Sequence, residues 1–283
     1  MAENNNVEVK TTEPRVILTC VMSQPQFAEI TKMISSLNRE CRMIINGEGI
    51  STAFTDTANV AMLNMVYWKK SFEKYEYTNP ETTPSAEIGI DITIWKKYAK
   101  NVKKGMVVTW IVTQTQKEQT PEEITKGKCP EYSYTYTLSC GGSSQKITAL
   151  DVNTLRKMPN VSAITSFALD NTLSVCASEF IDAIKCAGDV SDKVTFDISK
   201  TEFQILSESA ESNFCKVVPV ISKTGPGAKA IFSNDYLKYF VKSIQYKKET
   251  LEVKLKTDCM IRVGMVDKNR EIVFCLAPRI KDY

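Results

Sequence analysis

Lysines occur in three stretches of the chain with a helical pattern, and in two of them they recur at helical spacing. Intervals of three and four residues place side chains on one face of a helix. A face of ammonium groups attracts phosphates as point charges and reads no base. Solvated lysine faces without a ligand are the commoner use of such a pattern. The lysines concerned are Lys96, Lys97, Lys100 and Lys103 in a first stretch, Lys185 in a second, and Lys238 and Lys242 in a third.

Histidine is absent from the chain, and this absence limits the chemistry. It excludes Ser-His-Asp and Cys-His catalysis and the usual metal sites. The nine cysteines are at least ten residues apart, so no zinc-ligand spacing occurs. The segment 225–229 contains glycines and a lysine but lacks the spacing of a phosphate-binding loop. We therefore expect no enzyme, no cofactor and no metal.

The overall charge gives no sign of a nucleic-acid partner. The 283 residues include 36 lysines and arginines against 33 acidic residues, a net charge of +3. Any basic surface must therefore come from segregation of charge within the fold. An odd number of cysteines without a signal peptide fits an intracellular protein, and no apolar run is long enough to span a membrane. The polar residues 1–13 are expected to form a disordered tail.

Apolar periodicity predicts an α+β chain. Helices are expected at 25–38, 93–103, 178–187 and 234–244. Strands are expected at 15–21, 41–45, 50–55, 60–67, 87–91, 106–113, 132–138, 146–150, 194–198, 202–208, 214–220, 251–256, 260–266 and 271–276. Charged or Gly/Pro-containing segments at 69–86, 114–129 and 222–227 are expected to be loops.

The pattern of the first half returns in the second. Phe27 and Phe180 are 153 residues apart, and at that offset Ile45 meets Ile198. A repeat this long indicates two similar domains, at 14–148 and 164–283, joined by a connector at 149–163. The connector carries Leu155 and Met158, which either pack on the body or form one wall of a partner groove.

Five short motifs, taken in order, resemble one family. They are Asp56-Thr-Ala-Asn-Val60-Ala-Met62, Glu87-Ile-Gly-Ile-Asp91, Leu150-Asp-Val, Val190-Ser-Asp-Lys-Val-Thr-Phe and the terminal Phe-Cys-Leu-Ala-Pro-Arg-Ile280. Their order and spacing are similar to those of DNA sliding clamps, the proliferating cell nuclear antigen (PCNA) family of archaea and eukaryotes. The resemblance covers the chain from about residue 15 to residue 280.

The resemblance implies the DNA clamp fold, in which each domain packs two helices on antiparallel sheets. Such clamps are processivity factors for DNA polymerase, rings of three subunits that encircle double-stranded DNA independently of its sequence. The seven lysines named above match basic sites on the inner helices. The first helix departs from the family, because Ala28, Glu29 and Ser35 stand where lysine is frequent. By resemblance, edges at 143–149 and 211–219 pair between subunits.

The resemblance also implies a surface that binds short peptide motifs of partners, namely DNA polymerase, clamp loader, nuclease and ligase. In this chain Thr55 and Cys259 replace residues common in that pocket, so the preferred partners are expected to differ. The matching positions are Val60, Met62, Leu155, Met158, Pro159, Leu276, Ala277, Pro278 and Ile280.

Two interpretations of assembly and role are compatible with the sequence. The first is a homotrimeric replication clamp. The alternative is a checkpoint or transcription clamp, one subunit of a heteromeric ring. The expected location is the nucleus in a eukaryote or the cytoplasm in an archaeon, with no membrane association.

Overall fold

The computed structural model describes residues 13–78 and 84–279. The predicted tail, apart from Glu13, and the pocket residue Ile280 lie outside the described residues. Within these ranges both halves follow one order: a strand, a helix, five strands, a helix and three strands. The first half comprises β1 (Arg15–Ser23), α1 (Gln24–Leu37), β2 (Glu40–Asn46), β3 (Gly49–Thr55), β4 (Ala61–Trp68), β5 (Lys74–Tyr77), β6 (Ser85–Asp91), α2 (Ile92–Ala99), β7 (Val107–Gln116), β8 (Tyr132–Cys140) and β9 (Ser143–Thr148).

The second half repeats this order. It comprises β10 (Asn171–Cys176), α5 (Ala177–Val190), β11 (Lys193–Ile198), β12 (Phe203–Glu208), β13 (Asn213–Val217), β14 (Val220–Thr224), β15 (Ala228–Ser233), α6 (Asn234–Ser243), β16 (Thr250–Leu255), β17 (Ile261–Val266) and β18 (Arg270–Leu276). Short helical turns lie between the repeated elements: η1 (Lys69–Ser71), α3 (Pro121–Thr125), η2 (Val152–Thr154) and α4 (Val161–Thr165).

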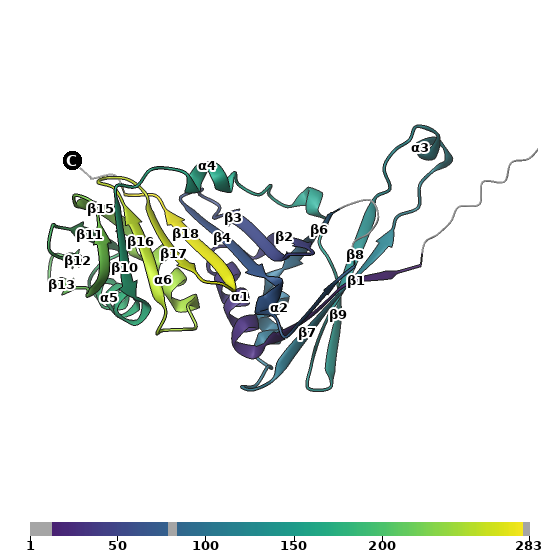
Figure 1. The fold of residues 1–283 in the computed structure, drawn as a ribbon, viewed down its shortest axis with the longest axis horizontal. Coiled ribbons are helices and arrows are strands. Elements are labelled where there is room, and N and C mark those ends of the chain that lie inside the picture. Colours follow the sequence, from purple (N-terminus) through teal and green to yellow (C-terminus); the bar gives the residue numbers. More distant parts are fainter. Residues whose placement is uncertain (1–12, 79–83, 280–283) are drawn as a thin grey trace, which may run out of the picture.

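A central sheet joins the two halves. Its strand order is β14-β10-β16-β17-β18-β4-β3-β2-β6, and the halves meet where β18 pairs antiparallel with β4. A sheet of order β5-β1-β7-β8-β9 and one of order β13-β12-β11-β15 lie at the two ends of the molecule (Figure 1). The hydrogen-bonded backbone therefore continues from one half into the other.

The two faces of the central sheet have different coverings. Alternate residues of a strand point to opposite faces, so in β18 Phe274 faces the helices, where its ring stacks on Phe240 of α6 at 4.5 Å between centroids. Val273 and Cys275 face the other way and form a small cluster with Met62 and Ile164 of α4. The helices thus lie on one side and the connector on the other (Figure 1).

The structure corrects several predicted elements. The second helix ends at Ala99 rather than Lys103, because Val102 N–H bonds to the Ala99 carbonyl and Met106 N–H to the Lys103 carbonyl, which are tighter i→i−3 turns. The expected loop 69–86 contains β5 and the start of β6, and the loop 222–227 contains the end of β14. Strands β10 and β15 were not predicted.

The predicted loop 114–129 forms an arm, and part of it is regular: residues 114–116 belong to β7 and residues 121–125 to α3. Strand β7 continues to Gln116, and β8 returns from Tyr132. Between them α3 starts with a capping box in which Thr120 accepts the Glu123 N–H and the Glu123 carboxylate accepts the Thr120 N–H. Figure 1 shows the arm projecting from the body.

Candidate functional site

The four long helices form a row in the order α2, α1, α6, α5, as their contacts show. Its cations are concentrated at the α2 end. The exposed lysines among those predicted are Lys96 and Lys97 in α2, Lys100 and Lys103 just after it, Lys185 in α5 and Lys242 in α6. These exposed lysines belong to no ion pair within the described residues, so their charges are available to an external anion.

Lys238 has a different environment from the other predicted lysines. It is half-buried, and its Nζ donates a hydrogen bond of 2.6 Å to the carbonyl of Gly188 in the last turn of α5. A cation at a helix C-terminus is favoured by the helix dipole. A Cβ at Gly188 would collide with the Lys238 side chain, so the missing side chain creates the space for this contact. Lys238 therefore fixes the α5–α6 contact and is not a free cation.

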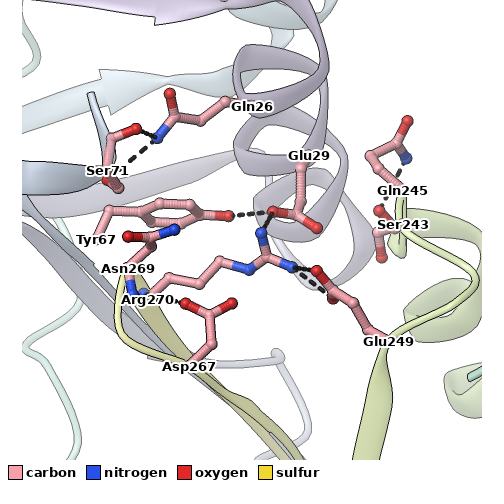
Figure 2. A network of polar contacts seen from close by, with 10 residues as sticks. All are labelled: Gln26, Glu29, Tyr67, Ser71, Ser243, Gln245, Glu249, Asp267, Asn269 and Arg270. Carbon is pink, nitrogen blue, oxygen red and sulfur yellow. Dashed lines mark hydrogen bonds and ion pairs between the residues drawn. The ribbon is translucent and has the colours of Figure 1, made fainter. Parts of the chain in front are cut away.

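The first helix contributes little charge, for a reason that the sequence did not show. Ala28 is 8% exposed and Glu29 is fully buried, because α1 lies between α2 and α6. Figure 2 shows the Glu29 carboxylate turned toward Tyr67 and Arg270, away from solvent. Lys32 is the exposed cation of α1. These two positions therefore lack lysine because they serve the packing of the helix row.

The fourth helix of the row, α5, carries mixed charge. Its exposed side presents Asp182 and Asp189 as well as Lys185, and Glu179 pairs with Lys216 at 2.8 Å. Phosphates are attracted less to such a face than to the lysines around α2.

On the opposite side of the sheet, Arg42 holds the connector in place. Its Nη2 donates to the Leu155 carbonyl at 2.9 Å and its Nε to the Arg156 carbonyl at 2.8 Å, while Nη1 pairs with Glu87 at 3.1 Å. The connector begins with an isolated bridge between Leu150 and Gly89 of β6. The Arg42 hydrogen bonds and the bridge between Leu150 and Gly89 together hold the connector backbone near Leu155 in place.

Arg156 and Asp56 order the loop beside the connector. Arg156 Nη1 donates to the Asp56 carbonyl at 2.9 Å. The Asp56 carboxylate accepts backbone N–H groups of Ala58, Val60 and Ala61 at 2.8–3.0 Å and the Tyr236 hydroxyl at 2.8 Å. Burial opposes ionisation, yet these donors together hold the pKa of Asp56 below its ordinary value. Neither the Arg42 nor the Asp56 network was predicted; the Asp-Thr-Ala-Asn turn was the available signal.

The structure divides the predicted pocket residues into three groups. Val60 is 36% exposed, and Leu155, Met158, Pro159, Ala277 and Pro278 are half-buried, so all six are accessible; we call them the connector face. Met62 is buried beneath Ile164. The placement of Leu276 in the peptide pocket is corrected, because its side chain is 1% exposed and faces the helix side of the sheet. The Ala277 N–H bonds to the Val60 carbonyl at 2.8 Å, which holds the C-terminal segment against the loop.

Two sheet edges are open at opposite ends of the molecule (Figure 1). β9 is the last strand of one sheet, and five of its six residues are exposed. β13 is the last strand of another, and its Val217 is 50% exposed. They lie within the predicted edges 143–149 and 211–219. An open edge presents unpaired N–H and C=O groups that can pair with another strand.

Side chains that could ligate a metal are scattered through the molecule. The described residues contain no group of three or more His, Cys, Asp or Glu side chains that would hold a metal ion. All nine cysteines are unpaired thiols. No helix of the described part is long and apolar enough to cross a membrane.

Comparison with known proteins gives a consistent result, although no protein-family model matches the chain. The chain is 30% identical over 278 residues to the DNA polymerase sliding clamp of Methanosphaerula palustris, covering 94% of this chain and 99% of that protein. The clamp of Methanospirillum hungatei is 28% identical over 271 residues, with the same coverage. Among solved structures, the A. fulgidus PCNA bound to the C-terminal region of FEN-1 has a TM-score of 0.79 and 25% identity, covering 94% of this chain and all of that one.

Proposed function

The chain belongs to the DNA polymerase sliding clamp family, and on this basis we propose how its surfaces carry out that role. It is a DNA polymerase processivity factor and not an enzyme. The observation that carries the proposal is the combination of 30% identity to a DNA polymerase sliding clamp over 94% of the chain with a lysine-bearing helix row and open edges at both ends.

The proposed assembly is a closed homotrimer. β9 of one subunit pairs with β13 of the next, and the same contact repeats around the ring. This head-to-tail pairing satisfies the backbone groups that both edges leave open. A checkpoint or transcription clamp in a heteromeric ring is disfavoured, because the relatives from Methanosphaerula palustris and Methanospirillum hungatei are both named as DNA polymerase clamps.

The helix row then lines the central hole and faces duplex DNA. Lys96, Lys97, Lys100 and Lys103 supply most of the attraction, with Lys185 and Lys242 adding single charges. Contact is with phosphates only, so it is independent of sequence and sensitive to salt. Topological closure, rather than affinity, retains the clamp on DNA.

The connector face binds short peptide motifs of DNA polymerase, clamp loader, nuclease and ligase. Its half-buried apolar side chains are of the kind that anchor short peptide motifs at recognition sites. The FEN-1 segment bound to the A. fulgidus relative supports this role. The proposed domain limits are 14–148 and 164–283, with the connector at 149–163. The proposed location is that of the DNA, the nucleus in a eukaryote or the cytoplasm in an archaeon.

Sedimentation of the purified chain tests the assembly. We expect three times the mass of one chain for the native protein. Val217→Glu, which places a charge on the open β13 edge, should yield monomers, whereas Val266→Glu, at another exposed valine away from both edges, should remain a trimer. A native monomer would contradict the proposed ring.

A further inference from the structure

A groove lies beside the connector face, on the side of the first half of the chain. This groove, which we call the connector groove, has a volume of about 570 Å³ and lies between the C-terminal turn of α1, strands β2 and β3, and residues 154–156 of the connector. Leu155 belongs to both the connector face and the groove. A peptide held at the connector face can therefore continue into the groove without leaving the surface.

Arginine dominates the charge of the groove. Arg39, Arg42 and Arg156 line it, and Glu40 is the one carboxylate among its described lining residues. Arg42 is neutralised by its ion pair with Glu87. Within the described part of the chain, Arg156 donates to neutral oxygens, the carbonyls of Asp56 and Thr57 and the amide of Asn59.

Arg39 is the accessible cation of the groove. It is exposed, and ion pairs within the described residues do not include it. Hydroxyl groups of Ser35, Ser36 and Thr154 also line the groove, but each already donates to a backbone carbonyl, those of Lys32, Met33 and Asp151 respectively. The planar guanidinium of Arg39 has a geometry that suits a carboxylate.

The floor of the groove is apolar. Phe54 is 6% exposed, Ala53 5% and Cys41 4%, so each presents only a small hydrophobic surface to the groove. A floor of small exposed surface with cationic walls suits an extended peptide that alternates small and acidic residues.

We propose that the connector groove binds an acidic flank of the partner peptide, adjacent to the motif held at the connector face. The acidic side chains meet Arg39 and Arg156, and the groove thereby distinguishes among partners that share the same apolar motif. This inference depends on the proposed peptide-binding role of the connector face. A basic flank would bring cations to Arg39 and Arg156 and bind more weakly.

Calorimetry with two sets of three synthetic peptides tests the proposal. Each peptide contains the FEN-1 C-terminal region extended by Asp-Ser-Asp, Gly-Ser-Gly or Lys-Ser-Lys, at the N-terminal end in one set and at the C-terminal end in the other. We expect the acidic extension, at one of the two ends, to bind about threefold to tenfold more tightly than the neutral one, and the basic extension more weakly. The difference should shrink at about 0.5 M salt, where charges are screened within a few ångström.

A charge reversal makes the test specific. Arg39→Glu should remove the preference for Asp-Ser-Asp and favour Lys-Ser-Lys, while the affinity for the Gly-Ser-Gly peptide stays within about twofold. Lys268→Glu makes the same charge change at an exposed turn outside the groove and should preserve the native ranking. Equal binding of the three peptides within both sets to the native protein would overturn this inference alone. Binding of none would overturn the peptide-binding role of the connector face, and the inference with it.

Discussion

Arg270 Nη1 lies 3.4 Å from Glu29 Oε2 in the interior between the two halves of the chain. Glu29 belongs to α1 and Arg270 to β18, so the pair ties the first helix to the strand that joins the halves. Arg270 Nη2 also donates to both oxygens of the Glu249 carboxylate, at 2.6 and 2.5 Å, and the Tyr67 hydroxyl donates to Glu29 at 2.7 Å (Figure 2). Burial raises the pKa of Glu29, although Arg270 and the Tyr67 hydroxyl oppose the rise.

Arg270→Met should strongly destabilise the chain. The change leaves Glu29 buried without its cation, and removal of one partner of a buried pair typically costs about 3–5 kcal/mol. The double variant Glu29→Gln with Arg270→Met removes both charges and should recover part of that loss. Urea unfolding of the native, single and double variants measures this, and equal stability of the native protein and Arg270→Met would show that the pair contributes nothing.

Asp56→Asn should lower stability near neutral pH, by about 1–3 kcal/mol, because one amide oxygen cannot accept all the donors that the carboxylate accepts. The folded pKa of Asp56 is below its ordinary value of 3.8. The contribution of ionised Asp56 to the free energy of unfolding is therefore complete above its ordinary pKa. This contribution is lost as the pH falls through the pKa of Asp56 in the folded protein. The stability difference between native protein and variant, from urea unfolding between pH 3 and 7, should shrink toward pH 3. A constant difference would mean that ionisation of Asp56 is not involved.

Lys96→Ala with Lys100→Ala should weaken clamp-dependent DNA synthesis more than Lys242→Ala does. Removal of an ammonium group that neutralises a phosphate lowers the dependence of DNA binding on salt. Processive synthesis on a long template at increasing salt concentration measures both effects. Lys238→Met should behave differently, with reduced thermal stability and an unchanged salt slope, because Lys238 is already bonded to Gly188. An unchanged salt slope in the α2 double variant would place these lysines away from DNA.

Pro278→Glu should abolish binding of the FEN-1 peptide and leave the oligomer intact. Pro278 is half-buried on the connector face, where a carboxylate would be desolvated by a bound apolar side chain. Calorimetry measures the affinity and sedimentation the assembly. Val266→Glu adds the same charge at an exposed position elsewhere and should bind the peptide normally. Normal binding by Pro278→Glu would exclude the connector face as the binding site.

The α+β class, the duplicated halves and the four long helices could all be predicted from the amino-acid sequence. Each of these depends on apolar periodicity, a property of neighbouring residues along the chain. The strand at Glu271–Leu276 could be predicted for the same reason, and this segment forms most of β18. The exposed lysines of α2 followed from their spacing, although the helix ends earlier than its apolar stripe suggests.

Which charged residues are free and which are structural depends on the tertiary structure. Glu29 and Lys238 have the spacing of solvent-facing residues, yet one is buried against Arg270 and the other is bonded to Gly188. β14 is mostly exposed, so no periodicity marks it, and its pairing with β10 makes it a strand. Leu276 was placed in the peptide pocket by resemblance, yet in β18, paired with Ala61 of β4, its side chain faces the helix side of the sheet. Which face a strand residue presents depends on pairing between segments that are distant in the sequence.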